Sequence, residues 1–164
     1  MKNGTALQDD SLGFWIYRIY AQASNHLRRT FQAHGYDCTP EQWGVLTRLR
    51  DEEGVNQSRL GARTFKDRHN IARILDLLEK RRLIERRSDA DDRRAYRVFL
   101  TPEGKETEEK LRVLVMRHRT GMFDGLSATD VETMRRIFAL IERNIEKRDD
   151  LLSQRIRGGS RNGG

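Results

Sequence analysis

The chain has 164 residues, of which 35% are charged and 36% hydrophobic, and it carries a formal net charge of +7. No window approaches the roughly 20 consecutive apolar residues of a membrane span, so we expect no membrane partner. The length fits one domain, or two small units that share a core. We expect a cytoplasmic protein. The single cysteine, Cys38, excludes an intramolecular disulfide framework.

The positive charge is concentrated in about a quarter of the chain. Residues 58–100 hold 13 Lys and Arg against 7 Asp and Glu, which accounts for nearly all of the excess. A basic segment of this kind is typical of proteins that bind a polyanion such as DNA.

Three helices are predicted in the first third of the chain. Apolar residues recur at intervals of three and four over residues 11–34, which predicts an amphipathic helix. Thr39 can cap a second helix, because Gln42 lies at the spacing of a capping box. Asn56 can cap a short third helix over residues 57–63.

A fourth helix and two strands follow. Asp67 can cap this helix, and its buried face is predicted to consist of four residues at helical spacing, Ile71, Ile74, Leu75 and Leu78. The opposite face is polar and most basic in its first turns. One strand starts at Leu83, and residues 96–100 alternate as a second strand. The polar run RRSDADDRRAY between them predicts a β-hairpin with a polar tip.

The last part of the chain predicts two more helices and a tail. One helix runs from Thr101 to about residue 123, and the other starts at Ser127 with a long apolar stripe that continues toward residues 151–152. A single stripe of this length requires a partner helix. Residues 157–164 are rich in glycine and predict a flexible tail.

The predicted fold is mainly α with a small β-hairpin wing. The order helix, short helix, helix, hairpin over residues 39–101 is that of a winged helix-turn-helix. The major groove of B-DNA is about 12 Å wide and admits one helix, and a basic hairpin beside that helix can reach the neighbouring minor groove.

Between residues 39 and 111 the sequence resembles the MarR family of bacterial transcription regulators. The resemblance rests on TPEQWGVL, on QSRLGARTFKDRHNIARILDLLEKRRLIERR and on SDADDRRAYRVFLTPEGKE. It implies a homodimer whose helical dimerisation region comprises residues 1–38 and 102–156. It also implies that each winged unit, residues 39–101, binds one half-site of a palindrome in double-stranded DNA.

The resemblance also implies roles for individual residues. The implied DNA contacts come from the short helix, the fourth helix and the wing tip: Ser58, Arg59, Arg68, His69, Asn70, Arg73, Arg93 and Arg94. Arg suits guanine and Asn suits adenine. Asp91 or Asp92 would brace a wing arginine. Arg86 and Arg87 close the first strand, where we expect contact with the DNA backbone or plain solvation.

Three positions depart from the family pattern. Arg82 stands where the family usually has glycine after the recognition helix, so either the turn differs or Arg82 is strained, because a left-handed conformation costs a non-glycine residue roughly 1–2 kcal/mol. Phe65 and Lys66 replace the usual Gly-apolar pair before that helix.

A pocket for a small aromatic or acidic effector is one interpretation of four aromatic residues, Tyr17, Tyr20, Phe31 and Trp43, between the dimer helices and the winged unit. Ordinary core packing is the favoured alternative. Arg28 could meet a ligand carboxylate.

Cys38 lies just before a helix N-terminus, which would lower the pKa of a thiol. A redox switch and a plain small residue are both open, and we favour the second. The four histidines show no metal-ligand spacing with Cys or a carboxylate, so we expect no metal.

Catalysis has no support in the sequence, which lacks a Gly-rich phosphate loop and a nucleophile elbow, and we expect no cofactor. We therefore predict a homodimeric repressor that binds a palindromic operator and is released by a small molecule. The alternative is a helical dimeric adaptor for protein interactions without selective DNA binding.

Overall fold

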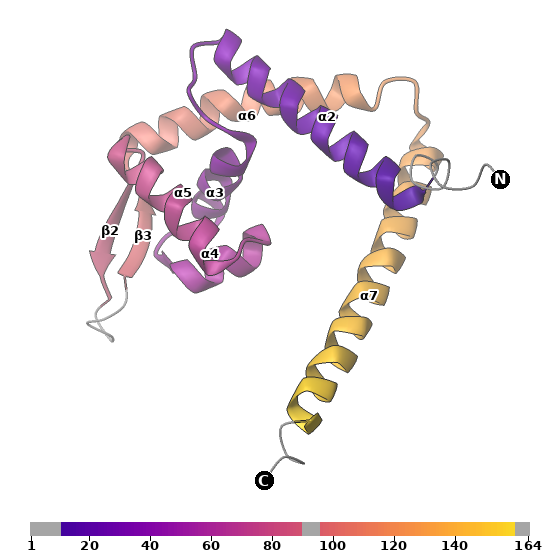
Figure 1. The fold of residues 1–164 in the computed structure, drawn as a ribbon. Coiled ribbons are helices and arrows are strands. Elements are labelled where there is room, and N and C mark those ends of the chain that lie inside the picture. The colour runs from indigo at the N-terminus through magenta and orange to yellow at the C-terminus, as the bar shows by residue number, and fades with distance from the viewer. Residues whose placement is uncertain (1–10, 90–95, 160–164) are drawn as a thin grey trace, which may run out of the picture. The chain divides into compact units, whose positions relative to one another are not determined.

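The computed structural model describes residues 11–89 and 96–159, with side chains as far as Ser153. The chain forms two compact units, divided between Met122 and Phe123. The first unit holds helices α2 to α6 and a small sheet, and the second holds helix α7 (Figure 1).

The second and third helices of the structure start at the predicted caps, Thr39 and Asn56. Helix α2 spans Leu12–Ala33, α3 spans Pro40–Asp51 and α4 spans Gln57–Thr64. Thr39 accepts a hydrogen bond from the Gln42 backbone at 3.2 Å, and the Gln42 side chain accepts one from the Thr39 backbone at 3.1 Å. Both halves of the predicted capping box are thus confirmed.

Helix α5, Arg68–Lys80, is followed by strands β2, Ile84–Ser88, and β3, Tyr96–Leu100. These strands pair in antiparallel register, with Arg86 opposite Val98. A third strand, β1, Val55–Asn56, pairs with the other edge of β3, so the sheet has the order β1-β3-β2. The sequence predicted only the hairpin of β2 and β3, so it missed the third strand of the sheet.

Helix α6, Pro102–Met122, crosses α2 and closes the core of the first unit (Figure 1). The core consists of apolar side chains from every helix of that unit and from the sheet, among them Phe31, Leu46, Leu60, Leu75, Val98 and Leu111. A buried carboxylate, Glu108, joins α6 to α3, because it accepts hydrogen bonds from Thr47 at 3.2 Å and from Arg112 at 2.9 Å.

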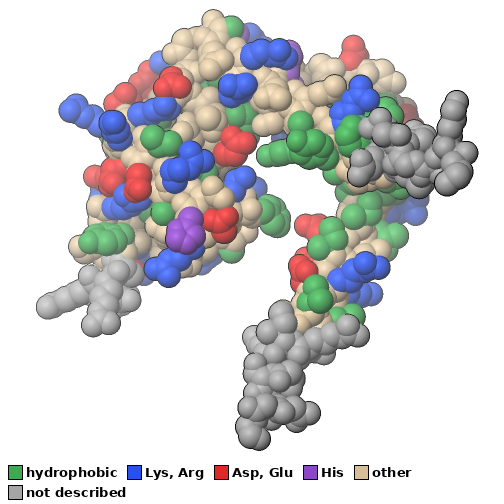
Figure 2. Space-filling view, viewed as in Figure 1, with side chains coloured by type: hydrophobic (Ala, Val, Ile, Leu, Met, Phe, Trp, Pro, Cys, Tyr) green, Lys and Arg blue, Asp and Glu red, His purple; other side chains and the backbone are tan. Residues whose placement is uncertain are grey.

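Helix α7 spans Ala128–Gly159. It continues beyond residue 157, where the sequence predicted the start of a flexible tail, so that boundary was wrong; the rest of the predicted tail, residues 160–164, lies outside the described residues. Apolar side chains alternate with charged ones along α7 (Figure 2). Among the described helices, none is long and apolar enough to cross a membrane.

Two turns next to helix α5 hold non-glycine residues in the left-handed region. Phe65, which ends α4, has φ 53°, and Arg82, just after α5, has φ 58°. These are two of the three positions at which the sequence departs from the family pattern. The turn at Arg82 therefore keeps the left-handed backbone, and the residue carries the strain that this costs a side chain with a Cβ atom.

Candidate DNA-binding interface

The start of α5 is fixed by its predicted cap. Asp67 accepts a hydrogen bond from the Asn70 backbone at 2.8 Å and another from the Asn70 side-chain amide at 2.6 Å. These two bonds lower the pKa of the Asp67 carboxyl. The Asn70 amide is thus held along the cap, and the second N–H of its NH2 group is not used by Asp67.

The outward face of α5 is exposed along its first turns. Ile71, Ile74, Leu75 and Leu78 are buried, which confirms the predicted apolar stripe. Four residues named as DNA contacts lie away from this stripe, Arg68, His69, Asn70 and Arg73, and all four are exposed. The structure thus leaves all four accessible on one helix.

The arginines of the winged unit fall into two groups. Arg59 pairs with Glu52 at 3.0 Å, and Arg97 pairs with Asp89 at 2.8 Å. Arg68 and Arg73 form no ion pair within residues 11–89 and 96–159. Acidic and basic side chains are intermixed over this unit (Figure 2).

The two arginines that close β2 are both engaged by other protein groups. Arg86 donates to Glu79 at 2.6 Å and to Asp76 at 2.7 Å. Arg87 pairs with Glu85 and lies over the ring of Phe99, 4.5 Å from its centroid. The expectation of plain solvation was wrong for Arg86, because its guanidinium is bound by two carboxylates, and contact with the DNA backbone stays a prediction. The predicted wing-tip residues Asp91, Asp92, Arg93 and Arg94 lie outside the described residues.

A polar groove of about 340 Å³ lies where α4, α5 and the sheet meet. Ser58 and Arg68 both line it, as do Arg86 and Tyr96. The sequence did not identify Tyr96 as a site residue, because strand alternation grouped it with the buried Val98. In the structure the Tyr96 side chain is 55% exposed, which places a phenol beside the cations of this groove.

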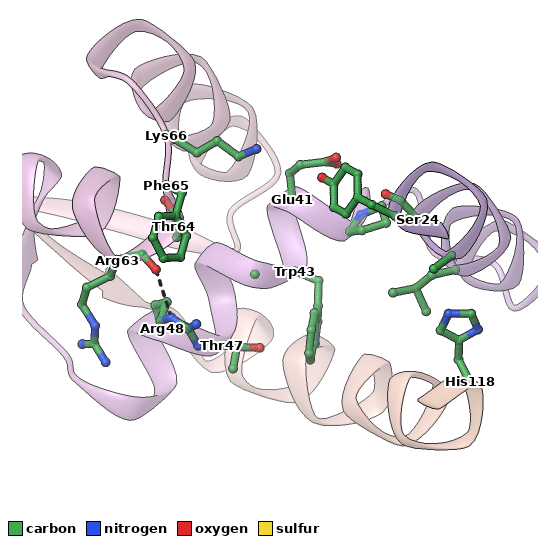
Figure 3. A pocket seen from close by; sticks show the side chains of 15 residues that line it. Ser24, Glu41, Trp43, Thr47, Arg48, Arg63, Thr64, Phe65, Lys66 and His118 are labelled. Atoms are coloured by element: carbon green, nitrogen blue, oxygen red, sulfur yellow. Dashed lines mark hydrogen bonds between the residues drawn. The ribbon is translucent and has the colours of Figure 1, made fainter. Parts of the chain in front are cut away.

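A second cavity, of about 380 Å³, lies among α2, α3, α6 and the turn before α5 (Figure 3). Of the four predicted pocket residues, Tyr20 and Trp43 line it. Tyr17 and Phe31 are absent from its wall, since Phe31 is fully buried in the core and Tyr17 is exposed.

The sequence missed several residues of this second cavity. Phe65 and Lys66 line it from the turn before α5, Glu41 from α3 and His118 from α6. Arg48 and Arg63 also line it, and Arg48 donates to the Arg63 carbonyl at 3.4 Å (Figure 3). Arg28 does not line the cavity, and its guanidinium donates a hydrogen bond to the Asn25 side chain. Phe65 could not be identified because its left-handed turn depends on the tertiary fold.

Two of the histidines that are scattered in the sequence meet in the fold. The Nδ1 atoms of His26 in α2 and His118 in α6 lie 3.0 Å apart. Burial, followed by the charge of His26, lowers the pKa of His118. The described residues contain no group of three or more His, Cys, Asp or Glu that could hold a metal ion.

Cys38 is buried, and burial raises the pKa of its thiol to about 12. The expectation that the neighbouring helix N-terminus would lower this pKa was wrong, because desolvation outweighs the charge of Arg81 and the other favourable contacts.

Comparison with known proteins agrees with this geometry. The model of the MarR family matches residues 36–95. The HTH-type transcriptional regulator TtmR of Methylorubrum extorquens is 31% identical over 143 residues, which cover 87% of this chain and 68% of TtmR.

Two solved structures share the fold. A mutant of Escherichia coli MarR complexed with operator DNA is 24% identical, with a TM-score of 0.74 over 79% of this chain and 92% of that one. Bordetella bronchiseptica BpsR, described with regulation of its DNA binding by 6-hydroxynicotinic acid, is 22% identical, with a TM-score of 0.75 over 82% and 94%. The exposed basic helix, the hairpin beside it and these matches lead to one conclusion: the chain belongs to the MarR family of winged-helix, DNA-binding transcription regulators.

Proposed function

We propose that this regulator is a repressor that reads a palindromic operator through α5 and the hairpin. The observation that carries this proposal is the pair of uncompensated arginines, Arg68 and Arg73, on the exposed face of a helix whose other face is buried. Arginine donors suit guanine edges and phosphates, and a single helix fits the major groove. From the sequence, Arg93 and Arg94 would enter the minor groove, with Asp91 or Asp92 as a brace.

The other predicted contacts have different roles in this proposal. Ser58 lines the polar groove together with Arg68, where both can meet a phosphate. Arg59 first has to exchange Glu52 for a phosphate. Asn70 can donate to adenine through the amide N–H that Asp67 does not accept.

A second copy of the chain would cover the exposed apolar side chains of α2 and α7. These are Leu12, Trp15, Ile16 and Ile19 on α2, and Ile137, Phe138, Ile145 and Leu151 on α7, and each is at least 45% exposed. Apolar surface of this extent is typical of an interface between subunits. Two winged units related by a two-fold axis would engage half-sites about one helical turn apart.

An effector in the cavity beside Tyr20 and Trp43 would be placed to change DNA affinity. The volume of about 380 Å³ suits a small aromatic molecule. Phe65 and Lys66 form part of the cavity wall and also the turn that leads into α5. A ligand that displaces this turn would reorient the recognition helix, and Lys66 offers a cation for an acidic group.

Selection from a random-sequence DNA library tests the proposal. The wild-type protein should enrich a two-fold symmetric motif and bind it with an affinity that falls steeply with salt. The double substitution Arg93→Ala with Arg94→Ala should abolish tight binding while the dimer stays folded. A matched control, Arg28→Ala with Arg29→Ala on α2, removes equal charge and should bind nearly as wild type does. Enrichment of no motif would favour the adaptor, and a folded wing variant that binds normally would refute the wing contacts.

A further inference from the structure

Arg86 in strand β2 joins the hairpin to the recognition helix. Its Nη1 atom donates to Glu79 Oε2 at 2.6 Å and its Nη2 atom donates to Asp76 Oδ1 at 2.7 Å. The Arg86 side chain is 21% exposed, against 61% for its neighbour Arg87. We call these three residues, Arg86, Asp76 and Glu79, the Arg86 cluster. Both terminal amino groups of this arginine are therefore occupied by carboxylates of another element.

The two acids of the Arg86 cluster are not explained by the stability of α5 alone. Asp76 and Glu79 are three residues apart, so they lie on one face of the helix and repel each other. They also lie in its last turns, where the helix dipole disfavours negative charge. Arg86 compensates both charges at once, with the planar fork that suits two acceptors. The acids and the arginine thus form one unit across two elements.

The Arg86 cluster lies at the base of the hairpin. Arg86 pairs with Val98 in the ladder between β2 and β3, so an arginine fixed to α5 also fixes the hairpin relative to that helix. The chain between α5 and β2 is short, residues 81–83, and passes through the left-handed Arg82. Figure 1 shows strands β2 and β3 of the hairpin beside α5.

We propose that Arg86 is a positioning residue for DNA binding, which holds the hairpin and α5 in the relative orientation that two adjacent grooves require. The proposal rests on the proposed DNA-binding function. Arg86 itself does not contact phosphate, because its donors stay with Asp76 and Glu79. Loss of the cluster lowers specific affinity because the helix and the wing no longer reach their grooves together.

Neutralising the two acids gives a test in which the competing explanations predict opposite signs. Asp76→Asn with Glu79→Gln removes two negative charges from a DNA-binding face, which by charge alone should tighten binding. A positioning role predicts weaker binding to the enriched motif, by roughly tenfold, within the range for coupled neighbours. The matched control Glu85→Gln removes one negative charge from the same hairpin outside the cluster, and its affinity should be unchanged or higher.

Substitution of Arg86 tests the same point from the other side. Arg86→Ala should lose affinity for the motif to a similar extent, and Arg86→Lys should recover little, because a lysine cannot reproduce the two-acceptor geometry. On a scrambled duplex of equal length, the salt dependence of Arg86→Ala should match that of wild type. A salt slope smaller by about one would mean that Arg86 contacts a phosphate, and it would overturn the proposal.

The outcomes separate this inference from the proposed function. If wild type enriches no motif, sequence-specific repression fails, while the slope on scrambled DNA still decides whether Arg86 contacts phosphate. Urea unfolding of each variant shows which of them fold. If Arg86→Ala does not fold, the acid-neutralised variant and Arg86→Lys carry the test. Tighter motif binding by the acid-neutralised protein, with Arg86 present, would refute positioning.

Discussion

Gly104, in the first turn of α6, has no room for even the methyl side chain of alanine. A Cβ atom at this position would lie 1.9 Å from the carbonyl oxygen of Leu83 and 2.9 Å from its carbonyl carbon. That oxygen also accepts a hydrogen bond from the Thr101 backbone at 3.1 Å. The close approach joins the helix start to the chain that leaves the recognition helix, so neither side can move freely.

The change in the free energy of unfolding follows from one stabilising and two destabilising contributions. Alanine is favoured over glycine inside a helix by about 0.8–1.0 kcal/mol. Forcing a methyl group into occupied space typically costs about 1–3 kcal/mol, and weakening the Thr101 hydrogen bond costs about 1 kcal/mol more. Because the Leu83 oxygen must move by more than about an ångström to reach ordinary contact distance, we expect Gly104→Ala to lower the free energy of unfolding by about 1–3 kcal/mol.

Urea unfolding, followed by circular dichroism, measures this difference against a control of opposite sign. Gly44 lies inside α3, and a Cβ atom there would meet no atom within 4 Å. Gly44→Ala should therefore raise the free energy of unfolding by up to about 1 kcal/mol. If Gly104→Ala were as stable as wild type while Gly44→Ala behaved as expected, the close approach to Leu83 would be refuted.

Three further predictions concern single side chains. Arg82→Gly should raise the free energy of unfolding by roughly 0.5–1 kcal/mol, because it relieves a left-handed φ of 58° at some cost in chain entropy; Arg82→Ala keeps the Cβ atom, and an equal gain in urea unfolding would contradict the explanation. The Cys38 thiol, whose pKa burial raises to about 12, should react with iodoacetamide near pH 8 at least about tenfold more slowly in folded than in unfolded protein, as measured by mass spectrometry; rapid labelling of the native state would refute this. The lowered pKa of His118 means that the unfolded chain binds the proton more tightly than the folded chain does. The stability that neutral His118 contributes is therefore present above about pH 6.5 and is lost as the pH falls below that value. The difference in unfolding free energy between wild type and His118→Gln should shrink from pH 8 to pH 5, and a constant difference would contradict this explanation.

Local signals in the sequence predicted the elements well. The caps at Thr39, Asn56 and Asp67 act within three residues of the helix that they start, and all three accept the expected backbone hydrogen bonds. Strand β1 was missed because two residues have no periodicity, and its pairing opposite Val98 is set by contacts more than 40 residues apart. The buried Glu108 was missed for the same reason, since Thr47 is distant in the chain.

The sequence indicated which segments form the candidate site, but it did not predict which of the arginines form ion pairs. Charge and spacing indicated the basic face of α5 and the hairpin that follows. Sequence alone could not separate the arginines, because ion pairs such as Arg59 with Glu52 depend on how helices pack. For the same reason the sequence wrongly placed Tyr17 and Phe31 in the cavity wall and did not predict Phe65 there.

The acidic residues of this basic unit are best understood through the arginines that they bind. A DNA-binding face would gain affinity for any duplex if every arginine were free, since the phosphate contribution is independent of sequence. Glu79 and Asp89 instead hold Arg86 and Arg97 to the protein. Cations without an acidic partner in the described part of this unit include Arg68 and Arg73, in the first turns of the helix that fits the major groove. The acids thus reduce general attraction to DNA, while Arg68 and Arg73 keep their full charge on the exposed face of α5.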